Sequence, residues 1–215
     1  IEGAGKSTVA RYIQQWLQSR GQAAVLTRGH GGKTLAERVR ALVLEPDGEA
    51  IPPAAEMLLM FAARSIHLAN LIRPALTRGD WVICDRFTDA TRAYQGAGRG
   101  LDPAHIESLA TLVHADLVPD LTLLLDLPVA VGLARARARA RRGQNQDHAL
   151  QRTDRFEQER GSFFERVRAA YLALARADAR RFQILDASRE LPVVQAAVAD
   201  ALQVLWSKSA ADGNP

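Results

Sequence analysis

The sequence contains one cysteine and only three lysines, and it has no long uninterrupted apolar run. The single cysteine, Cys84, excludes a disulfide within the chain and favours a reducing, cytoplasmic setting over a secreted one. No apolar run approaches the roughly 18 to 20 residues that span a bilayer, so we expect no membrane partner. The first residues also lack the charged start and apolar core of a signal peptide.

Because lysine is scarce, almost all of the positive charge is carried by arginine, and the formal net charge is +4. The guanidinium group binds phosphate with a planar fork of donors, so this composition suits phosphate-bearing ligands. An arm that follows a nucleic-acid backbone is an alternative interpretation of the arginine-rich run 134–142. No aromatic residues are interleaved there for base stacking, so we expect no nucleic-acid partner.

The composition, 47% hydrophobic and 24% charged, is that of a globular domain with a proper core. Short β-branched runs alternate with longer stretches of helical period, which indicates βα units around a parallel sheet. The predicted strands are 23–27, 81–85, 121–126 and 182–186. Three of them end in aspartate, and the carboxyl ends of parallel strands line the ligand crevice. We therefore expect Asp85, Asp126 and Asp186 to face the site.

Apolar residues at helical spacing predict three main helices, one ending before Gly21, one from Leu58 to Leu76 that closes at Gly79, and one from Leu191 to Leu205. The Ala/Arg run 134–142 predicts a helix that continues into a flexible flap. The sequence thus indicates one α/β domain over 1–206, with a parallel β-sheet flanked by helices on both faces. We expect a mobile lid at about 142–155 and a frayed polar tail over 207–215.

The opening residues, from Glu2 to Thr8, match the end of the phosphate-binding P-loop G-x-x-x-x-G-K-[ST]. We expect the first glycine of this motif, and the strand that leads into it, just before Ile1. In such a loop, backbone N–H groups and the helix N-terminus face the phosphates, Lys6 reaches the outer phosphates and Ser7 can ligate magnesium. The alternative is an ordinary glycine-rich turn before a helix. The predicted ATP-binding residues are Glu2, Gly3, Ala4, Gly5, Lys6, Ser7 and Thr8.

A P-loop alone leaves hydrolase, switch and kinase open. The chain has no N-K-x-D motif, which a guanine-nucleotide switch requires to bind its base. Instead, Asp85-Arg86-Phe87 follows a predicted strand. Asp85 can organise magnesium or an acceptor, and Arg86 can hold a second phosphate group. The alternative is a strand-end aspartate that caps a turn beside a surface arginine.

A larger set of motifs makes the kinase interpretation specific. The set comprises the P-loop, the run 58–64 (LLMFAAR), the runs 85–91 (DRFTDAT) and 93–96 (AYQG), the run 119–122 (PDLT) and the run 154–157 (DRFE). In order and spacing these motifs resemble bacterial thymidylate kinases from residue 1 to about 206. The resemblance implies a P-loop kinase fold, transfer of the γ-phosphoryl group of Mg-ATP to dTMP, Mg²⁺ as cofactor, and a homodimer.

The resemblance also implies roles for individual residues. The acceptor base would stack on Phe61 and be bound by Arg64, Thr91 and Gln95, although Phe61 on its apolar stripe could equally be a core residue. Glu2 would accept a hydrogen bond from the sugar 3′-hydroxyl, and Arg86, together with Arg28, would hold the acceptor phosphate. Because Gly3 occupies the position of a P-loop arginine in eukaryotic relatives, the resemblance implies a lid arginine. The candidate is Arg155, with Arg152 and Arg142 as rivals, and we expect Arg135 to Arg141 to be solvated.

Two departures from the family pattern concern the acceptor side and the lid. The usual Thr-Arg-Glu-Pro-Gly-Gly-Thr is replaced here by residues 27–33, TRGHGGK. We expect His30 in this run to be an ordinary loop residue. In the lid, Gln144 to Gln151 resembles an insertion. Because of these departures, a kinase for another nucleoside or nucleotide is an alternative to a dTMP kinase. A non-catalytic nucleotide-binding regulator is a second alternative.

Overall fold

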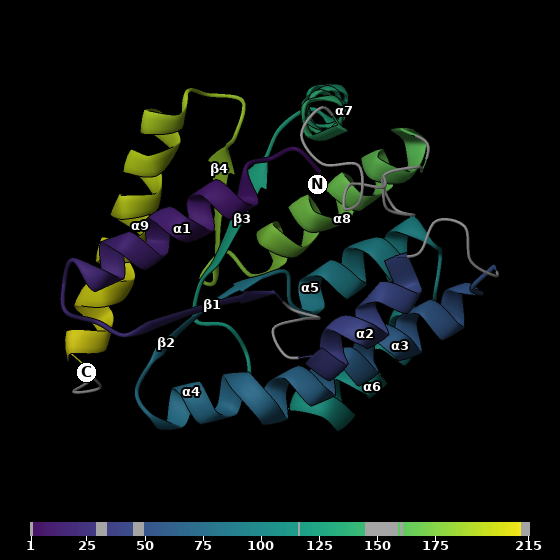
Figure 1. Ribbon diagram of the computed structural model, residues 1–215, viewed down its shortest axis with the longest axis horizontal. Coiled ribbons are helices and arrows are strands. Elements are labelled where there is room, and N and C mark those ends of the chain that lie inside the picture. The colour runs from purple at the N-terminus through teal and green to yellow at the C-terminus, as the bar shows by residue number, and fades with distance from the viewer. Residues whose placement is uncertain are drawn as a thin grey trace.

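The computed structural model describes residues 2–28, 34–44, 50–115, 117–144, 159 and 161–211. Parallel strands and many helices alternate along the chain, as the sequence predicts for an α/β protein (Figure 1). The strands are β1 (Ala24–Arg28), β2 (Trp81–Asp85), β3 (Thr122–Asp126) and β4 (Phe182–Asp186). The helices are α1 (Lys6–Gln18), α2 (Thr34–Leu44), α3 (Pro53–His67), α4 (Arg73–Thr77), α5 (Thr88–Thr91), α6 (Pro103–His114), α7 (Val129–Gln144), α8 (Gly161–Ala177) and α9 (Leu191–Ala211), with the π-helical segments η1 (Leu68–Ile72) and η2 (Arg92–Gly98).

The four predicted strands are confirmed within one residue at each end, and they pair in parallel. β1 pairs with β2 from Ala24↔Trp81 to Arg28↔Asp85, and β3 pairs with β4 from Thr122↔Phe182 to Asp126↔Asp186. Among the described residues the strands form two separate two-stranded sheets rather than the one continuous sheet that we expected. The aligned registers place Asp85 at the same sheet edge as Arg28.

The helices gather into two groups. Helices α1 and α9 lie side by side at one end of the molecule, and α2, α3 and α6 pack together at the other end (Figure 1). The main core lies between α1, α8, α9 and the strands β3 and β4, and includes the fully buried Leu17, Phe164 and Val198. This arrangement leaves the carboxyl ends of β1 and β2 close to the start of α1.

The long helix predicted to close at Gly79 is confirmed as α3, η1 and α4 in succession. Gly79 follows it with φ 80°, a left-handed conformation that glycine adopts without strain, and Asp80 N–H bonds to the Ala75 carbonyl to end the helix. This 25-residue segment is long and apolar enough to cross a membrane by length and composition, but half of its most apolar window is buried within the protein. Core helices have the same character, so the segment is explained by packing.

The last helix is longer than the sequence indicates. We expected order to end near Trp206, but α9 continues to Ala211. The Trp206 ring stacks on Trp81, with ring centroids 6.0 Å apart, and meets the edge of Trp16 at 6.2 Å. This aromatic cluster anchors the end of α9, and the following alanine and lysine residues are good helix formers.

An apolar cavity of about 510 Å³ lies between the two sheets. Its walls include β2, β3 and the face of α1 that carries Val9 and Ile13, and its lining reaches Lys6 at the start of α1.

Candidate active site

The candidate phosphate loop occupies the turn that opens α1. Gly3 (φ 70°) and Gly5 (φ 85°) both have left-handed backbones, and the N–H groups of Thr8 and Val9 bond to the Gly5 carbonyl as the helix begins. A Cβ atom on Gly3 would collide with the carbonyl oxygen of Gly132 in the first turn of α7. No side chain therefore fits at position 3 while α7 packs against this loop.

A cluster of charged groups joins this loop to the end of β2. The Glu2 carboxylate forms an ion pair with Arg86, lies 3.7 Å from Lys6 Nζ, and accepts a hydrogen bond of 3.2 Å from the Tyr94 hydroxyl. Burial would raise the pKa of Glu2, but the charges of Arg86 and Lys6 outweigh that effect and lower it to about 2. Burial, with the positive charge of Arg86 beside it, lowers the pKa of Lys6, while Glu2 and Asp85 oppose the shift. Glu2 is therefore ionised at neutral pH and compensates two cations at once.

Arg86 occupies an unusual backbone conformation. It has φ 72°, the left-handed region that costs a non-glycine residue on the order of 1 kcal/mol or more. The strained turn is held by the Cys84 thiol, which donates to the Arg86 carbonyl at 3.3 Å, and the guanidinium lies 4.6 Å from the centre of the Tyr94 ring. Burial raises the pKa of Cys84 to about 12, so this thiol is protonated and is no nucleophile.

A second group of predicted residues comes together beside α3. Arg64 is fully buried, donates to Thr91 Oγ1 at 2.9 Å and to the Phe87 carbonyl at 3.4 Å, and lies 4.8 Å from the centre of the Phe61 ring. Burial lowers the pKa of Arg64 to about 10, which leaves it charged at neutral pH. Gln95 is buried nearby on η2, a π-helical turn of the kind that often occurs at functional sites.

Phe61 packs as the core alternative predicts. It is 2% exposed and belongs to a small apolar cluster with Met57, Ile106 and Ala110. In this conformation its ring has little free surface on which a base could stack. Its contact with Arg64 nevertheless keeps it at the edge of the buried polar group.

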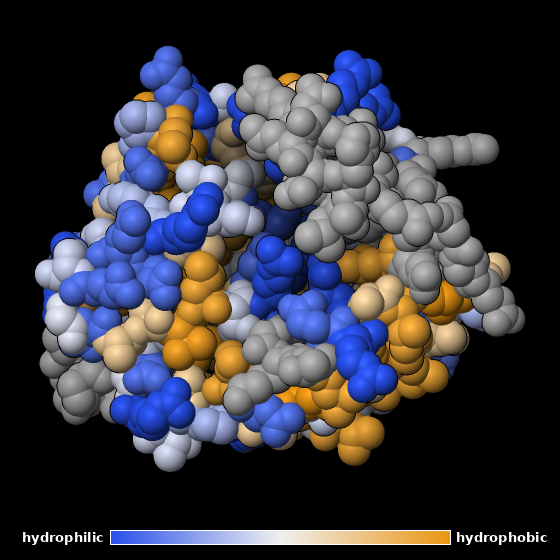
Figure 2. All heavy atoms as spheres, in the orientation of Figure 1, coloured by the Kyte–Doolittle hydropathy of each residue, from blue (hydrophilic) through white to orange (hydrophobic). Residues whose placement is uncertain are grey.

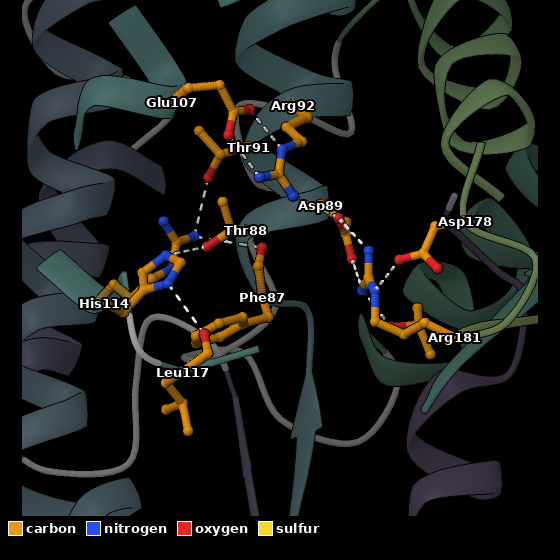
Figure 3. Close-up of polar contacts among 12 residues, drawn as sticks. Phe87, Thr88, Asp89, Thr91, Arg92, Glu107, His114, Leu117, Asp178 and Arg181 are labelled. Carbon is orange, nitrogen blue, oxygen red and sulfur yellow. Dashed lines mark hydrogen bonds and ion pairs between the residues drawn. The ribbon is translucent and has the colours of Figure 1, made fainter. Parts of the chain in front are cut away.

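A network that was not predicted from the sequence holds the segment after β2 in place (Figure 3). Asp89 forms ion pairs with Arg181 at 2.6 Å and with Arg92 at 2.8 Å, and Arg92 also bonds to Glu107. Thr88 Oγ1 lies 2.6 Å from His114 Nε2, and burial lowers the pKa of that histidine. Asp89 belongs to the motif 85–91, but no feature of the nearby sequence indicates Arg181 as its partner.

One arginine of α7 corrects the expectation that this run is simply solvated. Arg135 donates to the Ala187 carbonyl at 2.8 Å and to the Ser188 carbonyl at 3.4 Å, so it fixes the loop after β4. Arg139 lies close enough to Lys6 for its charge to lower the pKa of that lysine. The predicted lid residues Arg152 and Arg155, the side chain of Arg142 and the loop residue His30 lie outside the described part of the chain.

The remaining predicted residues lie at the loop and the sheet edge. Ser7 is exposed in the first turn of α1, Asp85 ends β2, and Arg28 is exposed at the end of β1. Within the described residues no group of three or more histidine, cysteine, aspartate or glutamate side chains could hold a metal ion. A hydroxyl and a carboxylate next to a phosphate site nevertheless suit Mg²⁺, which prefers oxygen ligands and keeps waters and substrate phosphates in its shell.

A loop with the phosphate-binding sequence lies at the start of α1, and beside it two cations surround one carboxylate. This is the arrangement expected of a P-loop phosphotransferase. The family model described as thymidylate kinase matches residues 1–198, and the chain belongs to this family. The prediction of a phosphotransferase that acts on dTMP is thereby confirmed.

Individual relatives agree with the family. The chain is 52% identical to a thymidylate kinase of Chromohalobacter salexigens over 92% of this chain and 89% of that protein, and 54% identical to one of Pseudomonas putida over 94% and 91%. A solved thymidylate kinase structure from Ehrlichia chaffeensis superposes with a TM-score of 0.71 at 27% identity, covering 95% of this chain and 94% of that one. The predicted P-loop kinase fold is confirmed.

The position of Arg139 leads to a prediction for α7. We expect Arg139→Gln to lower kcat on the order of 10²-fold, because it removes a positive charge close to Lys6, the predicted ligand of the outer phosphates. Arg137→Gln is the matched control, since this exposed arginine lies two residues before Arg139 in the same run. Steady-state rates with ATP and dTMP would compare the two. Equal rates for both variants would show that Arg139 is only solvated.

Proposed function

We propose that the chain transfers the γ-phosphoryl group of Mg-ATP to the 5′-phosphate of dTMP, giving ADP and dTDP for dTTP synthesis, in the cytoplasm. The observation that carries the proposal is the cluster of Glu2, Lys6 and Arg86, which joins the phosphate loop to the end of β2. Phosphoryl transfer requires mainly positioning and charge neutralisation, and this cluster supplies both.

On the donor side, the backbone N–H groups from Gly3 to Ser7 and the N-terminus of α1 would hold the ATP phosphates. Lys6 would reach the outer phosphates, because it is the cation that the loop itself carries. Ser7 and Asp85 would hold Mg²⁺, which neutralises charge on the phosphates when it is bound.

On the acceptor side, Glu2 would accept a hydrogen bond from the sugar 3′-hydroxyl, and Arg86 with Arg28 would hold the acceptor phosphate. Arg64, Thr91 and Gln95 would bind the base, and Phe61 would support them. The chain connects the two groups directly, because Tyr94 contacts Glu2 and the next residue is Gln95. Phosphate and base of one acceptor would thus be held by one continuous segment.

The cation that covers the transferring group would come from α7 or from the lid. Gly3 has no room for a side chain against Gly132, which supports an arginine from outside the P-loop. Arg155 stays the predicted lid arginine, and Arg139 is a further candidate because of its effect on Lys6. A cation that closes over the γ-phosphate would stabilise charge on the transferring oxygens and exclude water.

We also propose a homodimer formed through α2, α3 and α6. Large apolar side chains are exposed on these helices, namely Leu35, Leu42, Leu58 and Leu112, the last of them 80% exposed. Figure 2 shows hydrophobic residues gathered at the lower right, over the region where Figure 1 places these helices. Contiguous apolar surface of this kind is typical of protein interfaces.

The central test of the function is Lys6→Ala. We expect the variant to keep its fold and to lose about 10²- to 10³-fold in turnover, because the missing contact stabilises charge that develops on the phosphates. Release of ADP with dTMP measures the rate, and circular dichroism checks the fold. A panel of other nucleoside monophosphates in the same assay would separate dTMP kinase from a kinase for another acceptor. Near-normal turnover of a folded variant would refute the P-loop assignment, and no ADP release from the wild-type chain would favour a regulator.

The dimer is tested by Leu58→Glu. We expect this charge to weaken association on the order of 10²-fold, since an unpaired charge at a desolvated contact costs several kcal/mol. Val204→Glu on α9 is the control, because Val204 is also exposed but lies away from the three helices. Analytical ultracentrifugation measures the change, and a monomeric wild type or an unchanged Leu58→Glu dimer would reject the interface.

A further inference from the structure

A buried carboxylate lies behind the candidate base-binding residues. Glu56, in the first turn of α3, is 0% exposed, and the roles proposed above leave it unassigned. Removing an ionised carboxylate from water costs several kcal/mol unless charge and hydrogen bonds compensate it. Glu56 is therefore stable in this position only if neighbouring groups compensate its charge.

The compensation comes from η2 and the residue that follows it. Arg99 lies 3.4 Å from the Glu56 carboxylate through Nη2 and donates to it through Nε at 3.4 Å. Arg99 is itself fixed, because it also pairs with Glu159 and lies 5.0 Å from the centre of the Phe163 ring. Gln95 donates its side-chain N–H to Glu56 Oε1 at 2.8 Å.

This last bond determines which way the Gln95 amide faces. An ionised carboxylate has only acceptors, whereas a glutamine side chain has an N–H₂ group at one corner and a carbonyl oxygen at the other. The N–H₂ group must therefore face Glu56, and the carbonyl oxygen must face away from it. The opposite orientation would place an oxygen lone pair against a negative charge.

We propose that Glu56, with Arg99 as its counter-charge, is a positioning residue that orients the Gln95 amide and thereby selects a base with an N3–H group over one without it. The inference rests on the proposed role of Gln95 in base binding. A carbonyl oxygen directed at the base accepts a hydrogen bond from thymine N3–H. Cytosine carries a lone pair at N3 instead of an N–H, so the same amide orientation sets the Gln95 carbonyl oxygen against a lone pair there.

The test is Glu56→Gln, assayed with dTMP and dCMP. A neutral amide can donate or accept, so Gln95 can reverse and match cytosine. We expect KM for dTMP to rise roughly three- to tenfold, the loss of about one net hydrogen bond, with KM for ATP nearly unchanged. We also expect the ratio of kcat/KM for dCMP to that for dTMP to rise about tenfold or more.

The matched control is Glu107→Gln. Glu107, like Glu56, is a carboxylate paired with an arginine, but it is exposed and its partner is Arg92. We expect this variant to keep the wild-type preference. A second variant, Arg99→Met, removes the counter-charge and lets the Glu56 carboxyl take up a proton and donate a hydrogen bond. It should shift the base preference in the same direction, and it replaces Glu56→Gln if that variant does not fold.

Two results would overturn the inference. The first is an equal loss of kcat/KM for dTMP and dCMP in folded Glu56→Gln, because a purely structural role predicts no change in the ratio of the two values. If Glu56→Gln does not fold, the same result in Arg99→Met counts instead. The second is a change in ratio that persists undiminished when Gln95→Met is combined with the same variant, because the effect would then not pass through Gln95. Failure of the wild-type chain to phosphorylate dTMP would instead refute the proposed function, so the two failures are distinguishable.

Discussion

The carboxylate of Glu2 is the group on which the candidate site depends. Lys6 and Arg86 come from different elements and would repel each other if they were brought together alone. Glu2 lies between them, forms an ion pair with each, and is ionised because their charges lower its pKa to about 2. The same carboxylate accepts the Tyr94 hydroxyl and so connects the P-loop to η2. Without this shared anion, the two cations would repel each other beside the loop.

The same principle recurs along the segment that follows β2. Asp89 is compensated by Arg181 and Arg92, and the buried Glu56 is compensated by Arg99 and Gln95. Arg181 and Glu56 lie outside this segment in different parts of the fold, so residues 85–99 are held from several sides. A segment with so many fixed contacts can keep a strained residue such as Arg86, whose left-handed backbone would otherwise relax.

Elements that depend on local pattern were predicted well. The strand ends agree within one residue, because β-branched runs bounded by polar residues have few alternatives. The helix stop at Gly79 agrees because a left-handed residue is required there. The predicted end of α9 was wrong, because Trp206 is anchored by Trp16 and Trp81, which are far away in the sequence. The solvated interpretation of Arg135 was wrong for the same kind of reason, since its acceptors lie in the loop after β4.

The sequence by itself determined the α/β class, the P-loop, the motif at the end of β2 and the thymidylate kinase family, because these depend on residue types at fixed short spacings. Only the tertiary structure decided which buried charges pair, how Gln95 is oriented, and that Phe61 packs within an apolar cluster. Ion pairs such as Asp89 with Arg181 join residues about ninety positions apart. No local pattern encodes such a distance, because the partners meet only after the strands and helices have packed.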